Sequence, residues 1–545
     1  MAFSQDFLDL CNDPWGEAMM ARLKMRLDTD GGSGQLVTVT NLDGLLDVSP
    51  LDRRRERKWG VVQAQTWQVR LDHQNSSWNP NSEAYLTTQD TPVEAWGCLE
   101  IGFPAADKWE VGAQGKLQTA EVDTRSEVTL EFADPLLDVI AYELPRDLSL
   151  DAGAWVSPVY TTSKAAGSSE YDNTNGTLAV IAADDALVAW ETFVLEFKSA
   201  TTFDVVYEDG TTQSGGPFNI NANLNVKSLH NSQNVVQVMT AGWDQTGGAY
   251  STGDTFTFYT SPKVAASDLN PVGILIQLLT GGGYADFQSY NVLSGASQDV
   301  LYDLSGQWLT QKSALSSVLC KGLFPKGTRL VDMVQGILRA IGGSIYPTPT
   351  GQLALWVVGP AEAGSGKAVV TGDPDHDDPS ILYAKRTEER AGCASRIIYN
   401  YLLAESAQQT VDGEIDSPFA EATMDAADSD APFDPEVVKV VDIPWAISSA
   451  HMESQANIFL SRFSVPRPKF EVHGTLTNAL DADITDLVAL VEPALDEAGV
   501  TCQVTRQTVD LMTNTVTFRC WEDPNVSSTY AKVDTSLVDS ADKVW

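Results

Sequence analysis

Short apolar strands separated by polar turns recur along most of this chain, and its C-terminal part shows the pattern most fully. There, residues 437–445 predict a strand, 451–462 a helix and 470–476 a second strand. After a long polar connection, residues 500–520 predict further strands, and no catalytic motif interrupts the series. Because period-two alternation gives each strand one apolar face, the chain has to fold largely as sheets that bury those faces.

The same alternation appears closer to the N-terminus, within residues 61–72 and 127–132. Residues 155–260 form a further series of alternating strands without a helical period, in which Asp209-Gly210 supplies the two residues of a tight hairpin turn. This stretch predicts a separate, inserted β-sandwich of immunoglobulin-like size.

Two helices are well marked. Asn270-Pro271 provides an N-cap and a proline at the first helical position, and the glycines from Gly281 end that run. Residues 328–341 carry apolar side chains on one helical face and are followed by Gly342, a favoured C-terminal residue. A strand, a turn and a strand are predicted next, which makes a helix-plus-hairpin unit.

The order of elements in 437–521, the strand running into a polar turn at 128–136 and the helix-plus-hairpin unit resemble the baseplate and tail-tip hub proteins of long-tailed bacteriophages. The chain departs from the family pattern at 483–488, where Thr485 stands in place of the glycine of a Gly-Asp-x-Val turn. That difference leaves the strand register at this turn open.

The resemblance implies a mainly β fold with α+β segments. It comprises two tail-tube-like β-barrel hub domains, an inserted β-sandwich and a small helix-plus-hairpin domain. The expected divisions are a first hub-type barrel with its N-terminal segment (1–150), the inserted sandwich (151–265), a helix-containing α/β segment (266–360), a loop-rich connection (361–436) and a second hub-type barrel (437–545).

The function that the resemblance implies is structural. Three copies with two barrels each would present six similar units to a sixfold tail tube, so we expect a homotrimeric ring. Its partners would be other copies of itself, the tail tube or distal tail protein, and tail fibre or tip proteins. Genomic DNA would pass through without specific binding. The expected location is the virion tail, with assembly in the host cytoplasm, and the protein is expected to be no enzyme and to need no cofactor.

Two other classes of function stay open. Some tail proteins carry lysin domains, so the chain could be a cell-wall- or polysaccharide-degrading enzyme. It could also be a carbohydrate-binding tail adhesin, for which the inserted sandwich and the 14 tryptophans are the relevant features. An acidic chain offers carboxylate pairs everywhere, so such pairs neither support nor exclude glycoside hydrolysis.

Acidic residues outnumber basic ones by 74 to 35, for a formal net charge of −39. This balance argues against a nucleic-acid-binding surface, which needs clustered Lys and Arg. It suits either a wall that repels DNA or solubility in salty surroundings. No apolar run is long enough to span a membrane, and the acidic N-terminal segment does not resemble a signal peptide.

One basic run stands out against this acidity. It consists of Arg53, Arg54, Arg55, Arg57 and Lys58, interrupted only by Glu56. The run is either an exposed, solvated loop or a docking patch for the acidic surface of another copy or of a neighbouring tail protein. We therefore treat these five residues as interface candidates.

Candidate metal and phosphate sites are weak. Asp373, Asp375, Asp377 and Asp378 offer oxygen ligands for calcium, but the run lacks the glycine and the terminal glutamate of an EF-hand. The segment 364–367 resembles the end of a phosphate loop without its first glycine or its final hydroxyl, so a turn is expected there. We expect His451 and His473 to be structural, and no catalytic residue is assigned.

Overall fold

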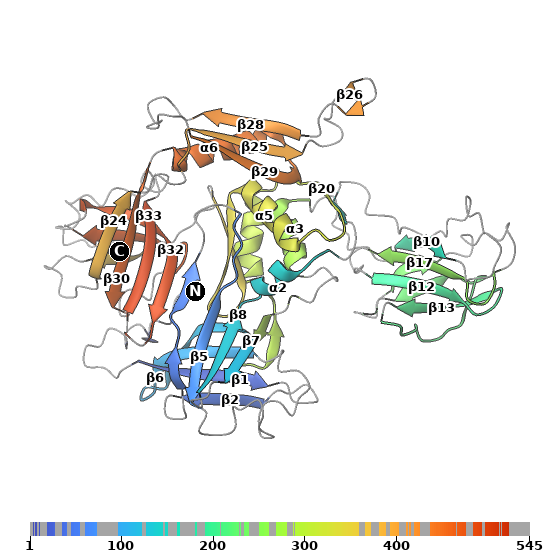
Figure 1. Cartoon of the computed structure of the whole chain (residues 1–545), viewed down its shortest axis with the longest axis horizontal. Helices are drawn as coiled ribbons and strands as arrows, with labels where there is room; N and C mark the ends of the chain where they lie inside the picture. Colours follow the sequence, from blue (N-terminus) through green and yellow to red (C-terminus); the bar gives the residue numbers. More distant parts are fainter. Residues whose placement is uncertain are drawn as a thin grey trace. The chain divides into compact units, whose positions relative to one another are not determined.

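The computed structural model describes most of the chain (Figure 1). The described residues are 19–27, 35–40, 45–54, 60–72, 96–122, 127–144, 148–150, 161–163, 180–182, 191–207, 209–227, 234–238, 250–260, 269–280, 289–358, 366–371, 381–388, 393–402, 410–411, 414–415, 419–425, 437–464, 466–475, 483–492, 496–511 and 515–522, with Ser4, Asp6, Phe7, Leu10, Leu229, Phe287 and Thr513. They form two compact units. The larger unit contains 1–143, 288–318 and 329–545, and the smaller contains 144–287 and 319–328. The fold is mainly β.

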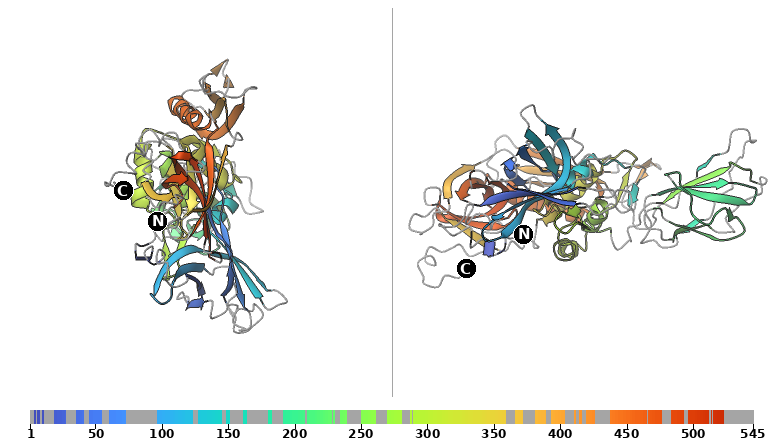
Figure 2. Two further views of the ribbon diagram at one scale, coloured as in Figure 1. Left: turned by 90° about the vertical axis from the view of Figure 1, so that its left-hand side faces the viewer. Right: turned by 90° about the horizontal axis from the view of Figure 1, so that it is seen from below.

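The N-terminal sheet of the larger unit has seven strands in the order β2-β1-β6-β7-β8-β5-β3, and every neighbouring pair is antiparallel. Its strands are twisted rather than flat (Figure 2). Their bounds are β1 Met20–Leu27, β2 Gln35–Thr40, β3 Leu45–Val48, β5 Thr66–Asp72, β6 Trp96–Phe103, β7 Lys108–Val122 and β8 Glu127–Ala133.

The C-terminal sheet also has seven strands. Six follow the order β23-β31-β32-β33-β30-β24, and the seventh, β4 (Leu51–Arg54), pairs with the far end of β32. The β23–β31 pair is parallel and the others are antiparallel. The bounds are β23 Gly366–Thr371, β24 Ile381–Glu388, β30 Pro468–Thr475, β31 Leu487–Glu492, β32 Asp496–Asp510 and β33 Thr515–Glu522.

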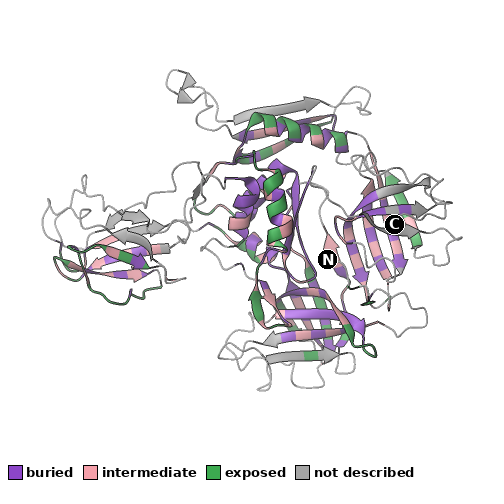
Figure 3. Ribbon diagram, turned by 180° about the vertical axis from the view of Figure 1, so that it is seen from behind, coloured by how far each residue is buried: buried purple, intermediate pink, exposed green. Residues whose placement is uncertain are grey.

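A single apolar cluster joins the two sheets. It includes Leu71 and Phe132 from the N-terminal sheet, Phe470 and Phe518 from the C-terminal sheet, and Leu51 from β4. Buried and partly exposed residues alternate along the strands of the C-terminal sheet, as Figure 3 shows. This is the alternation expected of strands that bury one face, so the two sheets share one core.

A smaller layer contains a three-stranded sheet, in the order β28-β25-β29, and helix α6 (Ser449–Phe463), which contacts β25 and β28. The strands are β25 Arg396–Leu402, β28 Phe419–Asp425 and β29 Val438–Ala446. Helix α5 (Leu330–Ile341) contacts β29, and the indole Nε1 of Trp445 donates to the carbonyl of Met333 at 3.2 Å. The left-handed Gly342 (φ 64°) ends α5, as the sequence predicts.

The rest of the larger unit consists of short elements. The hairpin of β21 (Gly343–Pro347) and β22 (Leu353–Val357) follows α5, which confirms the predicted helix-plus-hairpin unit. The other elements are α2 Leu136–Ala141, β18 Ser289–Asn291, β19 Ala296–Gln298, the π-helix η5 Leu304–Trp308, α4 Leu309–Ala314, β26 Thr410–Val411 and β27 Glu414–Ile415.

The smaller unit holds a five-stranded sheet, in the order β10-β17-β12-β13-β14, and a three-stranded sheet, in the order β11-β16-β15. Phe193 and Phe203 of the first sheet and Val226 of the second belong to one apolar cluster. Asn270 caps helix α3 by accepting from two backbone N–H groups, as predicted. The bounds are β9 Leu148–Leu150, β10 Thr161–Ser163, β11 Val180–Ala182, β12 Glu191–Phe197, β13 Thr202–Tyr207, β14 Phe218–Asn219, β15 Leu224–Lys227, β16 Asn234–Val238, β17 Thr255–Thr260, α3 Pro271–Leu279 and β20 Gly322–Phe324.

Three local features differ from the sequence-based expectation. Strands β23, β24, β25 and β28 lie within 361–436, where a loop-rich connection was predicted. Gly366 begins strand β23 instead of a turn, because it pairs with Leu487 more than a hundred residues later in the chain. Strand β29 joins β25 rather than the strands that follow it in sequence. In each case the pairing partner is distant in sequence, and a local pattern does not contain it.

Candidate assembly interface

Strand β4 links the two large sheets. Only two residues separate β4 from β3 of the N-terminal sheet. The four residues of β4 nevertheless pair with β32 of the C-terminal sheet. The carboxylate of Asp52 receives two hydrogen bonds from Arg506, at 2.6 Å from Nε and 2.7 Å from Nη2. Thr508 donates to the same carboxylate at 3.1 Å. Such two-armed pairing of guanidinium and carboxylate fixes geometry as well as charge.

Arg53 points to the other face of the same strand pair. Its guanidinium lies 2.8 Å from the Asp483 carboxylate and hydrogen-bonds to Gln507, a residue that is fully buried. Burial raises the pKa of the Asp483 carboxyl, but the charge of Arg53, together with the backbone N–H of Ile484 and other groups around the carboxyl, more than offsets this rise and holds the pKa below its ordinary value. Arg53, the first interface candidate, therefore has its partners within its own chain.

The remaining members of the basic run divide into two groups. Arg54 ends β4 opposite Arg506 and is partly exposed. Arg55, Arg57 and Lys58 lie outside the described residues. The docking role expected for the run stays a prediction, which now concerns Arg54 and these three residues.

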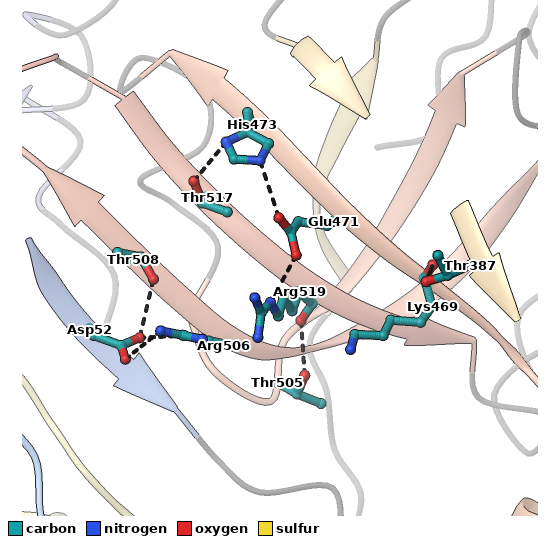
Figure 4. A network of polar contacts seen from close by, with 10 residues as sticks. All are labelled: Asp52, Thr387, Lys469, Glu471, His473, Thr505, Arg506, Thr508, Thr517 and Arg519. Carbon is teal, nitrogen blue, oxygen red and sulfur yellow. Dashed lines mark hydrogen bonds and ion pairs between the residues drawn. The ribbon is translucent and has the colours of Figure 1, made fainter. Parts of the chain in front are cut away.

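The outward face of the C-terminal sheet carries a polar network, drawn in Figure 4. Arg519 Nε donates to Glu471 at 3.0 Å, and His473 lies between Glu471 and Thr517. Burial raises the pKa of the Glu471 carboxyl, but the charge and hydrogen bond of Arg519, together with those of His473, more than offset this rise, so the pKa lies below its ordinary value. The carboxylate is thus held ionised on this face.

A small hollow lies beside β4, lined among others by Leu51, Trp67 and Asp134. Asp134 accepts hydrogen bonds from the backbone N–H groups of Gln65 and Leu136, both at 2.7 Å. Burial raises the pKa of Asp134 to about 7, although these two bonds act against the rise. The carboxyl group holds the turn that leads from β8 into α2.

The candidate ion and proton-transfer residues do not form a site in the described part of the chain. Asp373, Asp375, Asp377 and Asp378 lie outside it. Within it, no group of three or more His, Cys, Asp or Glu side chains is placed to hold a metal ion. His451 donates from Nε2 to the carbonyl of Ala340 at 2.9 Å, and burial lowers its pKa. None of the described helices is long and apolar enough to cross a membrane.

Comparisons with known proteins gave structural neighbours but no sequence relatives. No family model matches the chain, and no curated protein matches it. Among the solved structures that match is the tail protein from Neisseria meningitidis MC58, with 7% identity, a TM-score of 0.41, and 93% of this chain and 97% of that chain covered. The 43 kDa tail protein of prophage MuSo2 from Shewanella oneidensis matches with 7% identity, a TM-score of 0.40, and coverage of 92% and 99%.

The prophage tail protein gp18 from Listeria monocytogenes EGD-e also matches, with 8% identity, a TM-score of 0.39, and coverage of 96% and 100%. All three are tail proteins, the class that the sequence resembles. At these identities and TM-scores the likeness by itself assigns no function to this chain.

The sequence alone did not indicate most of the polar contacts on β4 and on the outward face of the C-terminal sheet. Asp52 and Arg506 stand in different parts of the chain, and nothing in either segment indicates the other. Lys469 and Arg519 each appear as one outward residue of an ordinary alternating strand, and Lys385 lies in the stretch predicted to be a loop-rich connection. Only the strand register brings them to one face. The basic run in an otherwise acidic chain does mark the segment that contains β4. It does not indicate that β4 pairs with β32.

Proposed function

We propose that this chain is a structural protein of a bacteriophage tail tip or baseplate. Three copies form a closed ring that joins the tail tube, or a distal tail protein, to tip or fibre proteins that contact the host. The ring encloses the conduit through which DNA leaves, and the chain itself catalyses no reaction. The two seven-stranded sheets are the two tube-like barrel domains, and the smaller unit is the inserted sandwich.

The observation that carries this proposal is strand β4. Through it, one chain holds two seven-stranded sheets against one apolar cluster. The ion pairs of Asp52 with Arg506 and of Arg53 with Asp483 lie on opposite faces of the β4–β32 pair. A part that transmits force between a tube and a tip needs its two sheets held in a fixed relation, and these contacts supply it. Three such chains would present six sheets, which suits a sixfold tube.

The charge of the chain supports the conduit. A wall that bound phosphate groups would slow the passage of DNA, whereas a chain with net charge −39 repels it. The repulsion acts over a Debye length of about 8–10 Å at physiological ionic strength. Double-stranded DNA would therefore pass through the ring without being held.

The test is the assembly state of the purified full chain, alone and with tail-tube protein. Light scattering is expected to give three times the chain mass, and negative-stain images should show rings with a central hole. Monomers at high concentration with tube protein present would overturn the proposal. Clearing of peptidoglycan or polysaccharide by the lone chain in a zymogram would favour the enzyme, and binding of host glycans by a monomer would favour the adhesin.

A further inference from the structure

The outward face of the C-terminal sheet carries a row of basic side chains. Strand register places Lys385, Glu471, Arg519, Arg506 and Arg54 opposite one another across five neighbouring strands. Directly opposed residues in antiparallel strands share a face of the sheet. Four of these five side chains are basic; Arg519 is paired with Glu471 and Arg506 with Asp52 on the same face, and Lys385 and Arg54 add to these two pairs. We call this set the basic row.

The basic row is accessible and is edged by aromatic side chains. The side chain of Arg519 is 38% exposed, and Lys385 is also exposed. Tyr383, on the same edge strand as Lys385, is 56% exposed. Lys469 lies 5.2 Å from the ring of Trp521 in the adjoining row. Arginine and exposed aromatic residues are the side chains enriched at protein interfaces.

The outward face of the N-terminal sheet has the opposite charge. Strands β3, β5 and β8 and the end of β7 place five carboxylates there. The basic residues at the same register positions are Arg70 and, opposite Ala133 at the other end of the β7–β8 pair, Lys116. Arg70 is already paired with Asp47 at 3.2 Å and with Glu127 at 3.5 Å. We call this set the acidic patch; its carboxylates are Asp47, Asp72, Glu121, Glu127 and Glu131.

We infer that the basic row of one copy docks on the acidic patch of the next copy, so that the chain assembles head to tail. This inference rests on the proposed ring and names the surfaces that close it. A two-fold contact through the basic row would set like charges against each other, which costs affinity. A head-to-tail contact sets unlike charges together, and it closes into a ring when the rotation between copies allows it.

A second copy fits the basic row better than nucleic acid does. DNA would have to approach a chain with 74 acidic and 35 basic residues, whose overall field repels phosphate. The basic row also contains Glu471, which Arg519 already holds close to it. The same acidity makes another copy of the chain an abundant source of carboxylates.

Charge reversal on each surface tests the inference. The first variant carries Lys385→Glu and Lys469→Glu, the second carries Glu121→Lys and Glu131→Lys, and the third combines all four changes. A control variant carries Lys198→Glu and Lys326→Glu, which are exposed lysines of the smaller unit. Its change in net charge equals that of the first variant. Sedimentation velocity of each full-length protein gives the assembly state, and its melting temperature checks folding.

Each two-residue variant should weaken assembly at least about tenfold, because like charges then face each other across the contact. The four-residue variant should restore assembly to within about threefold of wild type, because it exchanges the two charges. The control should assemble like wild type. Raising the salt should weaken the wild-type contact and leave the melting temperature nearly unchanged.

Four results would overturn the inference. If both two-residue variants assemble as the wild type does, the two surfaces are not part of the contact between copies, although the chain still forms the ring. Failure of the four-residue variant, with a normal melting temperature, excludes charge pairing between them. The wild type could also retain a labelled DNA duplex. If the variant with changes at Lys385 and Lys469 loses that binding but assembles normally, the basic row binds nucleic acid and not another copy. A wild-type chain that stays monomeric overturns the ring and the contact together.

Discussion

Asp52 and Arg506 are separated by 454 positions in the sequence and form a two-armed ion pair with N–O distances of 2.6 and 2.7 Å. The pair lies on β4 and β32, the only described strands through which the N-terminal segment enters the C-terminal sheet. The two side chains are 28% and 29% exposed, so water screens them only in part. Their contact therefore contributes to holding the two sheets together.

Asp52→Ala should lower the free energy of unfolding by about 1–2 kcal/mol. Hydrogen bonds to charged groups contribute about 1.5–3 kcal/mol when sheltered, and partial exposure reduces that value. Urea denaturation measures the loss, and a double-mutant cycle with Arg506→Ala isolates the pair. The matched control is Asp47→Ala, which breaks a pair whose side chains are 48% and 42% exposed and should cost only about 0.3 kcal/mol. Equal losses would show that the Asp52 pair has no special role.

Arg53→Glu should destabilise the folded chain. The substitution places a carboxylate beside Asp483 and removes the partner of Gln507, in a region where both charged side chains are less than one-sixth exposed. Breaking such a sheltered pair costs about 3 kcal/mol. The docking hypothesis for the basic run instead expects an unchanged melting temperature for this residue. Thermal unfolding of Arg53→Glu beside Lys326→Glu, an exposed change outside the two proposed surfaces that is expected to cost less than about 0.5 kcal/mol, separates the two expectations.

The sequence predicted the elements whose cause is local. Alternation gave β5, β8, β12 and β13, and caps and glycines gave α3 and α5, because each depends on residues within a few positions. The mainly β class follows from those same patterns. The pairing of the strands could not be predicted from the same patterns. Strand β23 pairs with β31 and β4 with β32, and no short motif in the sequence indicates these distant partners.

The candidate site shows the same division. Arg53 was singled out because a basic run is unusual in an acidic chain, but its ion pair with Asp483 depends on a distant turn. The alternation of β30 and β33 predicts which of their residues face outward, whereas β24 lies in the stretch predicted to be a loop-rich connection. This alternation does not predict that Lys385 and Arg519 lie in one row, because that depends on register.

Asp134 should make stability depend on pH. Burial raises its pKa in the folded chain to about 7, from an ordinary value of 3.8. Between about pH 4 and pH 7 the unfolded chain releases this proton while the folded chain keeps it, so the contribution of Asp134 to stability falls as pH rises. The fall is at most about 4 kcal/mol.

Denaturation of the wild type and of Asp134→Asn across that range measures the effect. The Asn variant loses one of the two backbone hydrogen bonds at every pH, which costs about 1–3 kcal/mol, but its residue 134 does not titrate. The wild type should therefore lose its advantage over the variant as pH rises. A difference that stays constant from pH 4 to pH 8 would mean that Asp134 is ionised throughout, held by the Gln65 and Leu136 N–H groups.

Thr485→Gly should stabilise the chain. Thr485 has φ 79°, in the left-handed region where a β-branched residue is strained, and its N–H still donates to the carbonyl of Val504 at 2.9 Å. Relief of such strain contributes about 1–3 kcal/mol, and the greater freedom of glycine in the unfolded chain removes up to about 1 kcal/mol of that gain. We expect a net gain near 1 kcal/mol in urea denaturation. Thr129→Gly, in the extended strand β8, is the control and should destabilise; a loss in both variants would contradict the strain.

The assembled ring should not retain double-stranded DNA at physiological salt. If the basic row is covered by the next copy, the surface left to the lumen comes from a chain with net charge −39, and it repels phosphate over about 8–10 Å. Gel retardation with purified rings tests binding directly, and a reconstruction of the ring allows acidic and basic residues to be compared per exposed area on the inner and outer walls. We expect a neutral or negative lumen. A net positive lumen that holds DNA would contradict the conduit, whereas an even spread of acidity over both walls would mean that the charge serves solubility.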